Sequence, residues 1–112
     1  MARNRESNRI INRLRSGHVG LKQYLSKINQ ADSPNCPHCH TQENREHYLL
    51  HCQLYKNQRN LLKSELQNIG IKTEQFTLKT LLGGGKFDNL IQKKIIKLVL
   101  KFIKDTGRSN DL

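Results

Sequence analysis

The chain has 112 residues, only 35% of them hydrophobic and none of them tryptophan, which predicts one small domain over residues 1–112 with a thin core. A net charge of +11 at pH 7 favours a polyanionic partner, either nucleic acid or an anionic membrane surface. No apolar run is long enough to span a membrane, and charged residues crowd the N-terminus where a signal peptide would lie. We therefore expect a nuclear or cytoplasmic protein that is neither secreted nor bound to a membrane.

The first predicted element is a basic helix from Glu6 to Arg15, with Ser7 as its N-cap and Gly17 just past its end. Arg5, Arg9 and Arg13 recur every four residues and so share one face, which Arg3 and Arg15 flank. Glu6 is the only acidic residue before Asp32, so this face lacks the acidic partners that a neutral solvated face carries. The candidate nucleic-acid contacts are therefore Arg5, Arg9, Arg13, Arg15 and, in a second short helix, Lys22. The alternative is a basic face that serves only solubility.

All three cysteines lie in one segment, residues 36–52, and they are spaced as metal ligands are. Cys36 and Cys39 form a C-x2-C pair, and His47 and Cys52 complete the pattern C-x2-C-x7-H-x4-C. This is a full Cys3His set for tetrahedral Zn²⁺, and four protein ligands leave no position for water, which is typical of a structural site. The odd number of cysteines argues against a disulfide framework.

The identity of the histidine ligand is less certain from spacing, because His38, His40 and His51 lie close to the cysteines as well. We favour His47. His51 directly precedes Cys52, and adjacent side chains on a helix point in different directions.

The rest of the chain is predicted to be helical. Thr41 is the expected N-cap of a helix through Leu50, and a helical pattern continues from Leu54 to a stop at Gly70. One or two further turns lead to a glycine-rich hinge at residues 83–86. A last helix begins at the N-cap Asp88 and ends at Gly107, with lysines along one face and a disordered tail, 108–112, after it. The prediction is an all-α domain organised around one structural Cys3His zinc site.

Several of these pieces together resemble the C-terminal region of polyproteins from non-LTR (LINE-type) retrotransposons, which follows the reverse transcriptase. The matching segments are Arg13–His18, Tyr24–Leu25, Ala31–Pro34, Cys36–Cys39, Glu46–Cys52 with Tyr55 and Arg59 after it, and more weakly Leu100–Gly107. The resemblance implies the same four zinc ligands that the spacing indicates. The family commonly has a proline directly after the last cysteine, where this chain has Gln53.

The resemblance and the charge together imply a non-catalytic module that binds RNA or DNA, mainly through phosphates. In such a polyprotein it would hold template RNA or target DNA for reverse transcription, and the rest of the polyprotein would be a further partner. The alternative is a zinc-stabilised protein–protein interaction module. A metal-dependent nuclease would need an open coordination position and an acidic pair near the cysteines, and the motif supplies neither.

Overall fold

The computed structural model describes residues 2–17, 19–109 and 112, and only the backbone of residues 2–7. It confirms an all-α fold. The helices are α1 (Ala2–Ser16), α2 (Lys22–Lys27), α3 (Lys56–Asn68), α4 (Leu78–Leu81) and α5 (Asn89–Asp105). A π-helical turn, η1 (His47–His51), and a 3-10 turn, η2 (Gln53–Tyr55), precede α3, and a second 3-10 turn, η3 (Thr73–Gln75), follows it. Extended backbone pairing in the described residues is confined to one isolated bridge, between Asn35 and Gln42.

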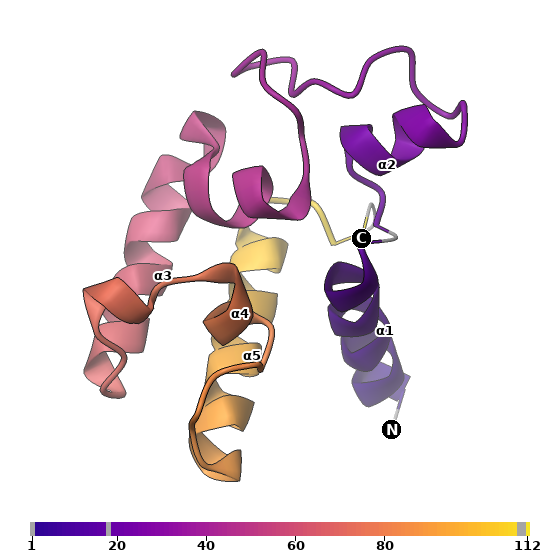
Figure 1. The fold of residues 1–112 in the computed structure, drawn as a ribbon. Helices are drawn as coiled ribbons and strands as arrows, with labels where there is room; N and C mark the ends of the chain where they lie inside the picture. The colour runs from indigo at the N-terminus through magenta and orange to yellow at the C-terminus, as the bar shows by residue number, and fades with distance from the viewer. Residues whose placement is uncertain (1, 18, 110–111) are drawn as a thin grey trace.

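Helix α5 is the centre of the packing. In Figure 1 it stands between α3 on one side and α1 on the other, with the short α4 across it. The centre of its apolar stripe, formed by Ile95, Val99, Phe102 and Ile103, is buried, and α5 packs against α3. The largest fully buried side chains of this core include Leu14, Tyr48, Leu62, Leu66, Ile95 and Phe102. The η1 and η2 turns join this core through Tyr48 and Tyr55, whose rings pack edge to face at 5.4 Å.

Most predicted helix ends are confirmed. The Asp88 carboxylate accepts the main-chain N–H of Ile91 over 2.8 Å, so Asp88 is the N-cap of α5. Gly17 and Gly107 lie just past the ends of α1 and α5 with φ of 82° and 75°, the left-handed conformation that glycine adopts without strain. In the described part of the chain, no helix is long and apolar enough to cross a membrane.

Two predicted N-caps are wrong. Helix α1 begins at Ala2, so Ser7 lies inside it and caps nothing. Thr41 belongs to an irregular segment, and the helical turn that carries His47 begins after Asn44, whose side-chain oxygen accepts the His47 N–H over 2.8 Å. Asparagine is as good an N-cap as threonine, so composition alone did not separate the two positions.

The C-terminal segment also differs from the prediction of a disordered tail. Arg108 binds Glu43, and Leu112 is buried, with its main-chain oxygen accepting from Arg13 Nη1 over 2.9 Å. These partners lie far away in the sequence, so local composition could not indicate them. Residues 110 and 111 lie outside the described part of the chain.

The glycines of the predicted hinge have a packing role. Gly83 has a φ of 87°, and a Cβ built on it would lie 2.7 Å from Nη2 of Arg15. Arg15 reaches this turn from α1 and donates its Nε–H to the main-chain oxygen of Leu82 over 2.7 Å. The positive φ therefore favours glycine at residue 83, and a larger residue there would also displace the end of the Arg15 side chain.

Candidate metal centre and basic surface

The four predicted ligands converge in space. One ligand atom from each of Cys36, Cys39, His47 and Cys52 lies within 4.8 Å of the other three. The Sγ of Cys52 is 3.9 Å from the Sγ of Cys36 and 3.9 Å from that of Cys39. Sulfurs on a tetrahedron with metal–sulfur bonds of about 2.3 Å are about 3.8 Å apart, whereas a disulfide would bring them to about 2.05 Å. The group is therefore sized for one metal ion held by free thiols.

The backbone explains how two loops present these side chains. His40, with a φ of 62°, donates its N–H to the Cys36 oxygen, and Cys36 in turn donates to the Thr41 oxygen. This tight turn directs Cys36 and Cys39 to one point. The π-helical turn η1 carries His47 and ends at Cys52, whose N–H returns to the His47 oxygen over 2.7 Å. One extra residue per turn, the property of a π-helix, lets a histidine and a cysteine five residues apart share one site.

His47 fits a ligand better than the other histidines do. Among the described residues, its Nε2 is the buried side-chain nitrogen or oxygen that lacks a hydrogen-bond partner. Such an atom is costly to bury unless something binds it, and a metal ion would. Its Nδ1 lies 3.4 Å from the Thr41 hydroxyl, which could accept the Nδ1–H in the tautomer that leaves Nε2 free to bind a metal. His51, in contrast, is exposed and lies 3.8 Å from Glu46.

Burial and main-chain donors set the protonation of the candidate ligands. Burial raises the pKa of the Cys52 thiol to about 12, whereas the main-chain N–H of Gln53 lowers the pKa of Cys39. Burial also lowers the pKa of His47, which keeps its imidazole in the neutral form that binds metals. A bound divalent cation would remove the thiol protons outright. The main-chain N–H groups of η2 therefore support the four candidate ligands by favouring the thiolate of Cys39.

Arg59 fixes the backbone beneath the site, a role that ligand spacing does not indicate. Its guanidinium is 5% exposed and donates to three main-chain oxygens, those of Tyr48, Leu49 and Cys52, over 2.8 to 3.0 Å. These oxygens belong to the C-terminal end of η1, where carbonyl groups lack helical partners and a positive charge is favourable. The planar fork of arginine can reach all three at once, which a lysine could not.

Glu43 also connects separate parts of the chain next to the site. It is 4% exposed, accepts the Lys22 N–H over 3.0 Å and pairs with Arg108 at 3.2 Å. The carboxylate thus joins the start of α2 and the C-terminal segment to the chain just before η1. A buried acid far from its partner in sequence has no local signature.

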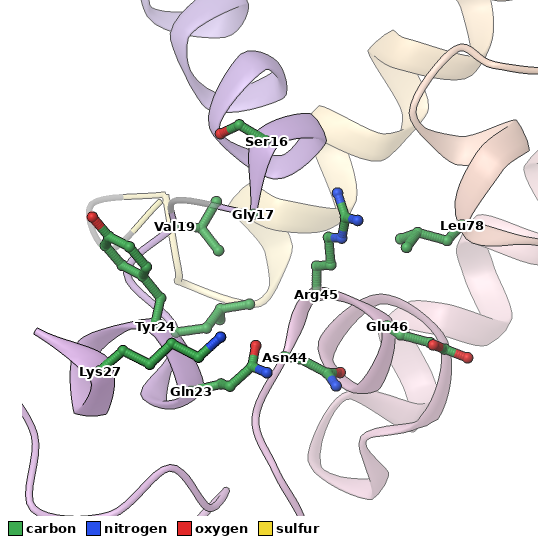
Figure 2. Close-up of a pocket in the computed structure, with 11 residues that line it drawn as sticks. Ser16, Gly17, Val19, Gln23, Tyr24, Lys27, Asn44, Arg45, Glu46 and Leu78 are labelled. Atoms are coloured by element: carbon green, nitrogen blue, oxygen red, sulfur yellow. The ribbon is translucent and has the colours of Figure 1, made fainter.

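A polar cavity lies beside these connections, between the end of α1, α2 and the residues before η1. Figure 2 shows Arg45 directed from its loop toward the end of α1, across from Gln23 and Asn44. Arg45 Nη1 donates to the main-chain oxygens of Leu14 and Arg15, at 2.7 and 2.6 Å. The guanidinium therefore caps the C-terminal end of α1. Arg45, a residue of the cavity wall, thus has a structural role.

The predicted basic residues are dispersed. Arg15 is exposed and lines a groove between α1 and α5, whereas Arg13 holds the Leu112 oxygen. Arg9 is exposed on α1 outside that groove, and Lys22 begins α2. The Arg5 side chain lies outside the described residues.

Comparison of the chain with known protein families, curated proteins and solved structures finds no match.

Proposed function

We propose that the Cys3His group binds one Zn²⁺ ion as a structural centre. Three thiols and an imidazole are ligands that zinc prefers, and tetrahedral spacing of about 3.8 Å between sulfurs agrees with the 3.9 Å separations. Four protein ligands leave no position for a reactive water, so the centre is proposed as non-catalytic. Binding would add on the order of 10 kcal/mol to folding, comparable to the whole stability of a small domain.

We propose further that the domain binds RNA or DNA through its phosphates. The observation that carries this proposal is the unpaired charge on α5. Lys93, Lys94 and Lys97 are exposed, and none of them forms an ion pair with a described carboxylate. Of the α5 lysines, Lys101 pairs with Glu65 at 3.0 Å. Lysines without acidic partners on a chain of charge +11 are typical of a surface that meets a polyanion.

The resemblance to the C-terminal region of LINE-type retrotransposon polyproteins suggests a biological setting for this binding. In that setting the domain would hold template RNA or target DNA near a reverse transcriptase, in the nucleus or cytoplasm. Arg59 and Tyr55, which take part in the resemblance, are both buried around the η1 and η2 turns. Both residues pack around the candidate zinc site, and the retroelement role is proposed on the sequence resemblance alone.

Fluorescence anisotropy tests the binding proposal. Labelled oligonucleotides of about 20 residues, both RNA and DNA, should bind at low salt, and the affinity should fall steeply as salt rises. About five neutralised phosphates imply a log–log slope of roughly −3.5 on single strands and −4.5 on duplex. Absence of binding to every probe at about 50 mM salt would refute nucleic-acid binding.

A protein-interaction module is the second candidate. Leu54 in η2 and Leu61 in α3 are 53% and 47% exposed and provide apolar contact area, and Leu54 is two residues from Cys52 in the sequence. This candidate predicts that substitution of the two leucines by serine changes no nucleic-acid affinity. It gains support if the protein retains zinc and fold but binds no oligonucleotide.

A further inference from the structure

A groove of about 940 Å³ separates α1 from the first half of α5. The two helices run in the same direction in Figure 1, and residues of both helices line the groove. Asn8, Asn12 and Arg15 line the α1 wall, spaced so that they share one helical face. Lys93 and Lys97 line the α5 wall. All five side chains are exposed. The groove is therefore open to a ligand along its length.

The charge in this groove has one sign. Each charged side chain among the described residues that line it is a cation, and Lys94 adds to the three already named. Lys93 and Lys97 are separated by one helical turn, about 6 Å along the axis, so together they could contact neighbouring phosphates. Arg15 faces them from α1, with one of its five N–H donors committed to Leu82. Its position at the turn of Gly83 is thereby fixed before any ligand binds.

The rest of the lining favours unpaired bases over a duplex. Asn8, Asn12 and Asn89 carry amides that both donate and accept, as the edges of bases do. Leu90 is 62% exposed and offers an apolar surface to a base. In a duplex these edges are paired and turned inward, whereas an unpaired strand exposes them.

We propose that the α1–α5 groove binds single-stranded nucleic acid. The phosphates contact Arg15, Lys93 and Lys97, and the bases meet the asparagines and Leu90. The inference rests on the nucleic-acid-binding function proposed above and specifies its site and its ligand.

The test compares a groove variant with a variant matched for charge. Lys93→Gln with Lys97→Gln removes two groove cations, and Lys56→Gln with Lys72→Gln removes two exposed cations outside it. The probes are a labelled strand of about 20 nucleotides, as RNA and as DNA, and the DNA duplex of the same sequence. The parent should bind a single strand at least about ten-fold more tightly than the duplex. The groove variant should lose about ten-fold in affinity, with a salt slope flatter by about 1.4, and the control less than about three-fold.

A neutral substitution separates the groove from general charge. Asn12→Ala alters no charge, so it should weaken single-strand binding about three-fold while the salt slope stays unchanged. Equal losses in the two lysine variants, or a parent that binds duplex as tightly as single strand, would overturn the groove proposal while nucleic-acid binding stands. A parent that binds none of the probes would overturn both. Metal content and thermal unfolding of each variant confirm that the comparison is made between folded proteins.

Discussion

Arg59 donates from Nη1 to the main-chain oxygen of Cys52 over 2.8 Å, so a buried positive charge contacts the backbone of a candidate metal ligand. Three thiolates and one divalent cation would leave one net negative charge at the centre. The guanidinium supplies the opposite charge, while its remaining donors bind the oxygens of Tyr48 and Leu49. Burial lowers the pKa of Arg59, but an arginine remains charged in proteins, so the compensation persists at neutral pH.

Arg59→Met should therefore destabilise the protein strongly. Methionine fills most of the volume but removes three buried hydrogen bonds to main-chain oxygens, and each loss costs about 1–3 kcal/mol. We expect the free energy of unfolding to fall by about 3–5 kcal/mol, measured by chemical denaturation with saturating Zn²⁺. Arg9→Met, at an exposed position of α1, is the control and should change it by less than about 0.5 kcal/mol. A variant at residue 59 as stable as this control would show that the buried charge contributes nothing.

The histidine ligand can be tested in the same way. His47→Ala should lose the metal and much of the helical signal, because its Nε2 is the buried atom without another partner. His51→Ala should keep both, since His51 is exposed beside Glu46. Metal content by mass spectrometry and circular dichroism measure the two effects. Metal retained by the first variant and lost by the second would transfer the ligand role to His51.

The candidate metal site and the last helix were predictable because their signals are local. The spacing from Cys36 to Cys52 indicates three cysteines and a nearby histidine, which in the structure is His47, and Asp88 with Gly107 marks both ends of α5. The supports of the site were not predictable. Arg59 and Glu43 act through partners on other elements, and Glu43 meets Arg108 across 65 residues of chain. A charged residue in a polar segment has the same local pattern whether it is solvated or buried.

The contact between Glu43 and Arg108 gives a third prediction. Both side chains are largely buried, at 6% and 17% exposed, so solvent screens their attraction only in part. Glu43→Gln and Arg108→Gln should each reduce the free energy of unfolding by about 2–4 kcal/mol, and the double variant by less than the sum. Thermal or chemical unfolding of the parent, the two single variants and the double variant gives the interaction energy as a double-mutant cycle. Glu46→Gln, at an exposed acid three residues away, is the control. Strictly additive losses would mean that the two side chains do not interact.

The last prediction separates the arginine ridge indicated by the sequence, formed by Arg5, Arg9 and Arg13, from the groove found in the structure. Arg9 belongs to the ridge and Arg15 flanks it, whereas of these two only Arg15 lines the α1–α5 groove, where its Nε–H donates to the Leu82 oxygen. Arg15→Gln should therefore reduce single-strand affinity about ten-fold at low salt, and Arg9→Gln only about two-fold, through the general field. Each substitution removes one positive charge, so a difference between the two affinity losses reflects where the charge lies and not how many charges remain. Anisotropy at several salt concentrations gives both affinity and slope, and the unfolding temperature of Arg15→Gln shows whether loss of the Leu82 bond has loosened α1. Equal effects at the two positions, with unchanged stability, would favour the ridge over the groove.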